Sequence, residues 1–198
     1  IAIVIEPSKR NSERFKKTFI TSLHDSENKK IWFLLLSGFT MFYDQREEWI
    51  LSEIDKLSDK IPYSQLQKLD LKILLLDPYS REFEIRGRWF INKIKSGNSQ
   101  FLRQKPSNLP DYIQSSVKII QELKNLCAKL INRVCIRLYK TTSIWRIHMF
   151  NDSCFVSMYD ENIDGHLTKL IQYPKSYLEY RALEKYFRAI WKKHSTPA

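Results

Sequence analysis

The sequence predicts an α/β domain built on a mixed β-sheet flanked by helices. Two continuous apolar runs, Ile31 to Ser37 and Leu71 to Leu76, are typical of strands that are buried on both faces. The segment between them has the apolar spacing of a helix, so the three form a βαβ unit with parallel strands. Short strand-like runs near the end of the chain have short connections, which favours antiparallel pairing and completes a mixed sheet.

The first half of the chain alternates helical and strand patterns. Apolar residues recur every four positions in the first segment, as expected of one helical face, and keep helical spacing again between the two buried runs. The second buried run stops before a proline, which disfavours its continuation. In chain order, the expected elements are a helix at Ser12 to Leu23, a strand at Ile31 to Ser37, a helix at Tyr43 to Leu57, a strand at Leu71 to Leu76 and a helix at Ser80 to Lys95.

A polar loop punctuated by Gly97, Pro106 and Pro110 separates the two halves. Beyond it, apolar residues at helical intervals predict a long amphipathic helix, and three or four strand patterns follow. The last helix comes after a proline, which suits the entry of a helix. In chain order, the elements are a helix at Asp111 to Asn132, strands at Val134 to Tyr139, Ile144 to Phe150, Cys154 to Tyr159 and Leu167 to Gln172, and a helix at Tyr177 to Lys193.

The length of 198 residues fits one domain with a sizeable core. We assign residues 31–198 to this domain and residues 1–30 to an N-terminal appendage or linker. The chain does not begin with Met, so we expect that an upstream domain or membrane anchor could have been removed. No apolar run reaches the roughly 18 residues that a membrane span needs.

Three cysteines, Cys127, Cys135 and Cys154, form no CxxC pair and lie within or beside apolar runs. We predict that they are reduced core residues, which indicates a cytoplasmic protein. The four histidines form no HExxH motif and no zinc-like spacing, so we expect no metal.

The formal net charge of +11 and the pI near 9.5 favour anionic partners such as nucleic acid, nucleotides or an acidic membrane surface. Neither GxxxxGK[ST] nor GxGxxG occurs, and only four glycines are available to build backbone phosphate cradles. We therefore expect no nucleotide-hydrolysis loop of these kinds and no cofactor.

The stretch Trp145 to Tyr159 places ionisable groups inside apolar strands, which indicates a site. It is predicted to form two strands joined by a tight turn at Asn151-Asp152-Ser153. Alternation along the first strand puts Arg146 and His148 on one face and the apolar residues between and beside them on the other.

The apolar runs at Ile31 to Gly38 and Leu71 to Pro78, together with the Trp145 to Tyr159 hairpin, resemble a phospholipase D-like domain over roughly residues 31 to 194. The resemblance implies an HxKxxxxD motif, in which His is the nucleophile, Lys binds phosphate and Asp follows. Active members bring two such motifs together within a chain or by a dimer.

Counted back from Asp152, that motif has Trp145 at the His position and Ile147 at the Lys position. A turn one residue shorter instead aligns Arg146-Ile147-His148 with HxK and reverses the nucleophile and the cation. The resemblance therefore implies either a degenerate binding domain or a substantially altered enzyme.

Each candidate residue has two interpretations. Arg146 either clamps a phosphate with its guanidinium fork or forms an internal ion pair with Asp152 or Asp77. His148 is either a nucleophile or general acid, or a hydrogen-bonded structural residue. Asp77 either positions a cation at the end of a strand or stabilises a turn before proline.

Four further residues are candidate ligand contacts. Two arginines lie among aromatic residues and could combine phosphate pairing with base stacking, although a packed aromatic face and a solvated basic face fit the same pattern. An arginine and a tyrosine on other strands would line one pocket with Arg146 if those strands are neighbours. These residues are Arg81 and Arg86, and Arg137 and Tyr159.

Taken together, the sequence predicts a noncatalytic domain that recognises a phosphate-bearing ligand, a nucleotide or nucleic acid. The resemblance implies that it works within a larger bacterial signalling or defence assembly. Two alternatives remain open: a phosphodiesterase or nuclease that uses His148 and is completed across a dimer, and an oligomerisation or protein-interaction module.

Overall fold

The structure is a computed structural model that describes residues 2–5, 11–24, 29–43, 49–60, 68–97, 102–131, 135–141, 143–159 and 168–198. The predicted element ends at Asn132, Val134 and Leu167 lie outside the described residues. The strands are β1 Ile3–Ile5, β2 Lys29–Leu35, β3 Leu69–Leu76, β4 Ile136–Tyr139, β5 Trp145–Met149, β6 Ser153–Met158, β7 Leu170–Pro174 and β8 Ser195–Pro197. The helices are α1 Asn11–His24, α2 Phe39–Tyr43, α3 Trp49–Lys60, α5 Arg81–Lys95, α6 Leu109–Ile131 and α7 Leu178–Lys193.

The strands form one mixed sheet with the order β1-β7-β6-β5-β2-β3-β4-β8. β2 is parallel to β3, as the βαβ pattern predicts, and β5, β6 and β7 form an antiparallel meander beside β2. The predicted fold class, an α/β domain with a mixed sheet flanked by helices, is therefore confirmed.

The pairing of β4 corrects one prediction. Its short connection to β5 favours antiparallel pairing, but β4 lies parallel to β3 and on the other side of the β2–β3 pair from β5. The connection from β3 to β4 explains the parallel pairing. The chain passes through α5 and α6 between the two strands, and such a crossover joins parallel strands.

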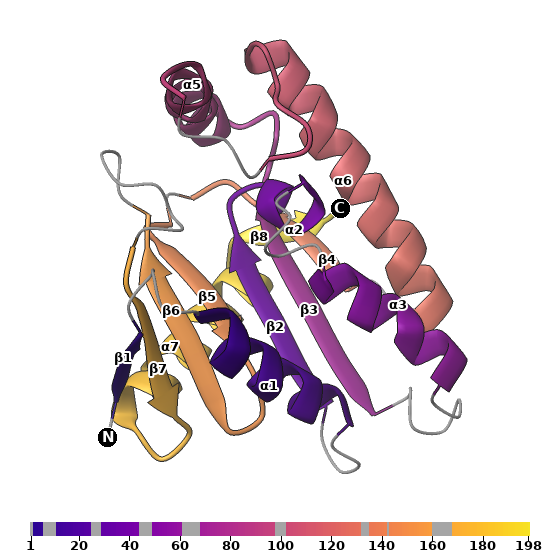
Figure 1. The fold of residues 1–198 in the computed structure, drawn as a ribbon, viewed down its shortest axis with the longest axis vertical. Helices are drawn as coiled ribbons and strands as arrows, with labels where there is room; N and C mark the ends of the chain where they lie inside the picture. The colour runs from indigo at the N-terminus through magenta and orange to yellow at the C-terminus, as the bar shows by residue number, and fades with distance from the viewer. Residues whose placement is uncertain are drawn as a thin grey trace.

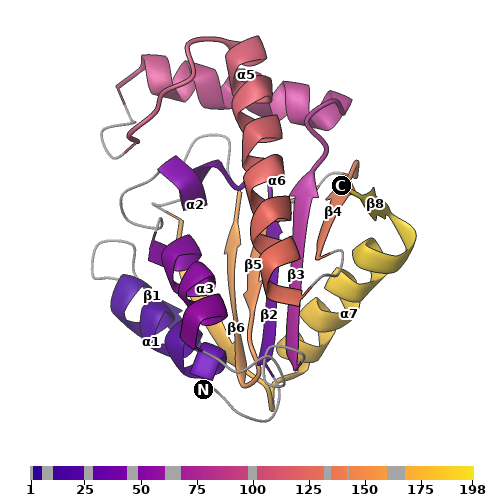
Figure 2. The same cartoon turned by 90° about the vertical axis from the view of Figure 1, so that its right-hand side faces the viewer.

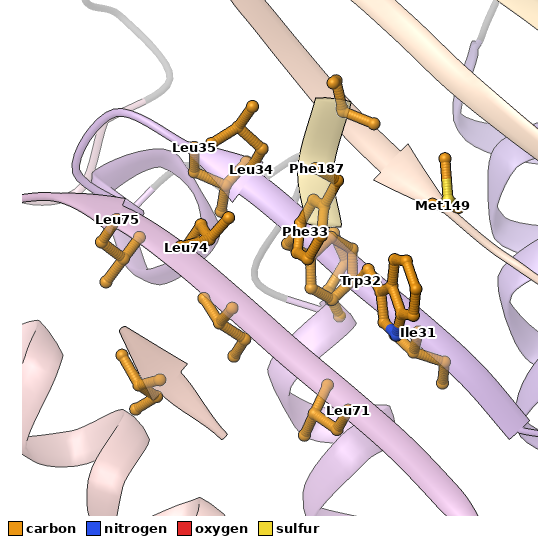
Figure 3. Close-up of a cluster of buried hydrophobic side chains, with 14 of the residues drawn as sticks. Ile31, Trp32, Phe33, Leu34, Leu35, Leu71, Leu74, Leu75, Met149 and Phe187 are labelled. Atoms are coloured by element: carbon orange, nitrogen blue, oxygen red, sulfur yellow. The ribbon is translucent and has the colours of Figure 1, made fainter. Parts of the chain in front are cut away.

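Helices cover both faces of the sheet (Figure 1, Figure 2). One face, called the α1 face here, is covered by α1, with α3 and α6 further along the sheet, whereas α7 covers the opposite α7 face. Two neighbouring residues of β2 show the division: Phe33 packs on Phe19 of α1, and Trp32 stacks on Phe187 of α7 at 5.0 Å between ring centroids (Figure 3). The continuous apolar sequence of β2 follows from burial on both faces.

The boundary predicted at residue 30 does not separate two packed units among the described residues. β1 pairs with β7 at one edge of the sheet, and Phe15, Phe19 and Leu23 of α1 are buried in the common core. The four-residue spacing that predicts this helix also supplies its buried face.

The cysteine prediction is wrong for two of the three residues. Cys127 at the end of α6 and Cys135 before β4 form a disulfide, with a Cα–Cα separation of 6.2 Å that lies in the usual range. The CxxC spacing does not reveal this disulfide, because eight positions separate the two cysteines across a helix–strand connection. The cysteine argument for a cytoplasmic protein is lost with it, and only Cys154 is a free, buried thiol.

None of the helices that the structure describes is long and apolar enough to cross a membrane.

Candidate functional site

The β5–β6 hairpin has the predicted arrangement. His148 pairs with Phe155 on β6 and with Phe33 on β2, while Arg146 pairs with Ser157. Because Phe33 faces α1, the side chains of Arg146 and His148 both project toward the α1 face. The turn closes with a hydrogen bond from the Phe150 amide to the Ser153 carbonyl, at 2.9 Å.

Arg146 lies at the end of the hairpin that borders the carboxyl end of β2. Leu34 pairs with Ile147, so the neighbour of Arg146 on β2 is Leu35. The arginine is only 7% exposed, and Ser157 opposite it is also buried. A guanidinium is thus held inside the sheet layer, next to the point where the parallel strands end.

His148 lies two positions further into the sheet and is enclosed by aromatic rings. Its imidazole centroid is 4.9 Å from the ring of Phe15 on α1 and 5.3 Å from that of Phe33. The residue is 4% exposed. α1 therefore covers this histidine from above.

Three tyrosines hold the chain where β2 ends: one from β4, one from α6 and one that directly follows β6. Tyr139 donates to the carbonyl oxygen of Leu35 at 3.0 Å, and Tyr112 donates to Ser37 Oγ at 2.7 Å. The Leu36 amide donates to the hydroxyl of Tyr159 at 3.2 Å. Gly38, which follows Ser37, has φ +67°, a conformation that L side chains rarely adopt.

Burial raises the pKa of Tyr112 and of Tyr139 well above the usual value for a phenol. Both hydroxyls therefore stay protonated and remain hydrogen-bond donors. The turn that follows β2 is consequently fixed by its neighbours at the carboxyl end of the three parallel strands, where open α/β sheets place their ligand sites.

Asp77 directly follows β3 at the same edge of the sheet and stabilises a turn. Its carboxylate accepts from the Tyr79 amide at 3.0 Å and lies 3.6 Å from Lys140 Nζ, just beyond β4. Arg86 also faces this edge, where its positive charge opposes the rise in the pKa of Tyr139. Its Nε donates to Glu82 at 3.1 Å, which is an ion pair along one helix.

Two candidates lie elsewhere. Asp152 is exposed at the turn of the hairpin, at the opposite end of β5 from Arg146. Arg137 faces α7, since it pairs with Leu74; its guanidinium donates to the hydroxyl and carbonyl of Ser195 and lies 5.6 Å from the ring of Trp191. The predicted pocket shared by Arg137 and Arg146 is therefore wrong, because strand alternation places the two on opposite faces.

The aromatic residues of α5 have two kinds of surroundings, which the sequence pattern does not distinguish. Phe83 and Phe90 pack against Tyr112, at 5.0 Å and 4.9 Å between ring centroids. Trp89 is half-buried with Lys93 Nζ 4.2 Å above its ring, and Arg81 lies on the exposed face of the helix.

A second polar cluster, on the α7 face, is not found by the sequence analysis. Trp32 is surrounded by the cations of Lys30, Lys72 and Arg188, at 4.4 to 4.8 Å from its ring centroid. Glu184 pairs with Lys30 at 2.8 Å and with Arg188 at 2.9 Å. In β3, Lys72 lies between apolar residues, and that alternation is the signal that could have placed this lysine on the α7 face.

Among the residues that the structure describes, no group of three or more His, Cys, Asp or Glu side chains is arranged to hold a metal ion.

Comparisons with known proteins give no family. No protein-family model matches this chain, and no curated protein matches it significantly. A solved structure of TrmBL2, an archaeal chromatin protein that shows a novel mode of DNA binding, covers 100% of this chain at 16% identity and a TM-score of 0.47. Phosphatidylserine synthase of Haemophilus influenzae Rd KW20 covers 99% of it at 11% identity and a TM-score of 0.45.

The chain spans only 55% of the first of these proteins and 40% of the second. Likenesses of this strength concern the fold at most and carry no argument about function.

Proposed function

We propose that this chain is a degenerate phospholipase D-like domain that binds a phosphate-bearing ligand without cleaving it. The ligand would be a nucleotide or nucleic acid, bound at the carboxyl ends of β2, β3 and β4. Arg146 would be the main anion contact, and Tyr159 would supply a hydrogen bond.

The position of Arg146 carries the proposal. A planar guanidinium presents a fork of donors that matches two phosphate oxygens and stays charged at any physiological pH. The side chain is 7% exposed and borders the carboxyl end of β2, which is the end of parallel strands where open α/β sheets place their ligand sites.

The surroundings of that edge support the same site. The segment from Leu35 to Ser37 is held by Tyr112, Tyr139 and Tyr159. Such a turn needs little rearrangement when a ligand binds, which lowers the entropic cost of binding. The net charge of +11 would attract an anionic ligand over a longer range.

The noncatalytic part of the proposal is supported by His148 and Asp152. A histidine nucleophile must reach the phosphorus atom, whereas Phe15 and Phe33 enclose this imidazole. Asp152 lies at the other end of the hairpin from Arg146. The residues that the motif would bring together are therefore spread along the full length of β5.

The test is the thermal stability of the chain with inorganic phosphate, mononucleotides, short nucleic acids and phosphorylated lipid head groups. A ligand at about 100 times its Kd stabilises the folded state by about 2.7 kcal/mol, or about 5 to 10 °C for a chain of this size. Arg146→Lys keeps the charge but loses the fork, so we expect binding about 10- to 100-fold weaker.

Arg137→Lys is the matched control, because it makes the same change on the opposite face of the sheet. It should leave the ligand-induced shift intact. Equal losses in both variants, or no shift with any of these ligands, would contradict the proposal. Cleavage of a phosphodiester substrate that His148→Ala abolishes would instead establish the phosphodiesterase alternative.

A further inference from the structure

The exposed face of α5 carries a straight row of cations. Arg81, Arg88 and Lys95 are each seven residues apart and are all exposed. At 1.5 Å per residue they lie about 10.5 Å apart along one side of the helix. Figure 2 shows α5 across the end of the molecule, beyond the arrowhead of β3.

Helix stability accounts for only part of this charge. Lys95 in the last turn complements the helix dipole, as Glu82 and Glu84 do in the first turn. Arg81 does the opposite, because it puts a cation at the positive end of the helix, and it makes no ion pair with the residues that the structure describes. A solvent-exposed row that includes an unfavourably placed cation indicates a binding surface.

Arg88 remains available to a ligand. It pairs with Glu84 at 2.7 Å, but the two side chains are 68% and 50% exposed. Exposed pairs of this kind contribute little to stability and exchange readily with other partners.

Two large hydrophobic side chains of the same segment are exposed. Tyr79, just before the helix, is 78% exposed, and Ile85 on the helix is 51% exposed. Tyr79 thus presents most of its ring to solvent, two residues before Arg81. An exposed aromatic ring next to a line of cations is the arrangement with which proteins bind single-stranded nucleic acid.

We propose that this surface, formed by Tyr79, Arg81, Ile85, Arg88 and Lys95, binds the backbone of single-stranded nucleic acid. The three cations would each contact a phosphate, and Tyr79 would stack on a base. The row spans about 21 Å, which corresponds to about six nucleotides at the 3.4 Å rise of a stacked strand. The inference rests on the proposed function for its class of ligand and adds a contact surface separate from Arg146.

An anionic membrane is the less favourable partner. Insertion requires a continuous apolar face, whereas Ile85 is flanked on its helix by Arg81, Glu84 and Arg88.

The test is fluorescence anisotropy with a labelled 12-nucleotide oligothymidylate, measured from low to moderate salt. Each phosphate contact on a single strand contributes about −0.7 to the slope of log K against log salt. The triple variant Arg81→Ala/Arg88→Ala/Lys95→Ala should therefore flatten the slope by about 2. Tyr79→Ala should weaken binding about 5- to 100-fold with the slope unchanged, whereas Tyr79→Phe should bind as the parent does.

α6 provides the matched control. Lys118→Ala/Lys124→Ala/Lys129→Ala removes the same charge from exposed positions of another helix, and it should leave the slope close to that of the parent. An equal effect of the two triple variants would show that net charge alone attracts the strand. An unchanged slope in the α5 variant would overturn the inference.

Two further arms complete the test. If a duplex of matched length bound more tightly than the single strand, the inference that this surface prefers single-stranded nucleic acid would be wrong. Binding to phosphatidylserine vesicles that the α5 variant loses, with oligonucleotide binding retained, would assign the surface to a membrane. The Arg146-dependent thermal shift with mononucleotides should persist in the α5 variant, so failure of this inference and failure of the proposed function are distinguishable.

Discussion

At the scale of single residues, two side chains on the same face of β5 have different surroundings, which suit one of them to ligand binding and the other to core packing. Arg146 and His148 share a face of β5, yet the first borders the end of β2 and the second lies beneath Phe15 of α1. The strand pitch moves His148 about 7 Å further under the helix. The same alternation therefore puts a cation near the edge of the sheet and a histidine in its aromatic core.

The bond between Tyr112 and Ser37 should be measurable in a double-mutant cycle. The phenol donates to Ser37 Oγ at 2.7 Å, and both residues are buried. We expect Tyr112→Phe and Ser37→Ala each to lower the free energy of unfolding by about 1 kcal/mol, and the double variant to lower it by less than the sum. Urea denaturation of the four proteins measures this coupling.

Tyr79→Phe is the control for loss of a tyrosine hydroxyl, since this ring is exposed. It should leave the stability unchanged. Additive losses in the Tyr112 and Ser37 cycle would show that the bond does not help to hold the turn after β2.

At the scale of elements, the sequence predicts most helices and strands because their apolar periods are strong. The continuous runs at β2 and β3 and the spacing of α1, α6 and α7 all have a buried face in the structure. Strand pairing is harder to predict from the sequence, because the partner of β4 depends on the crossover through α6 rather than on its short connection to β5. The candidate site is hard to predict for the same reason. Alternation shows which residues share a face of β4 with Arg137, but it does not show which helix covers that face.

The cluster that joins α7 to β2 should make stability depend on pH in the acid range. Burial alone would raise the pKa of Glu184, but hydrogen bonds from Lys30 and Arg188, and their charges, outweigh it and lower the pKa below the usual 4.5. A pKa that is lower in the folded state stabilises the fold above the pKa of the unfolded chain. This contribution is lost as the pH falls below about 4.5.

We therefore expect Glu184→Gln to lose stability at pH 6 and to show a weaker decline between pH 5 and pH 3 than the parent does. Urea unfolding at several pH values measures both effects. Glu179→Gln, at an exposed position of the same helix, should retain the decline of the parent. Parallel curves for Glu184→Gln and the parent would contradict the assigned role of the cluster.

At the scale of the whole molecule, the disulfide between Cys127 and Cys135 links the two crossover elements α6 and β4. Sequence reasoning misses it because the spacing of eight matches no short cysteine motif. Closing a loop of this length limits the unfolded chain and contributes about 2.5 kcal/mol in the chain-entropy treatment. Cys154 takes no part in the disulfide, and burial raises the pKa of its thiol to about 12, which disfavours the reactive thiolate.

A thiol count in denaturant without reductant tests this link directly. One reactive thiol per chain is expected, from Cys154, whereas three would show that the cysteines are reduced. The double variant Cys127→Ala/Cys135→Ala should unfold with a free energy lower by about 2.5 kcal/mol and should be insensitive to reductant. Reductant should weaken the parent by a similar amount, because it breaks the same link while the sheet and its covering helices keep their contacts.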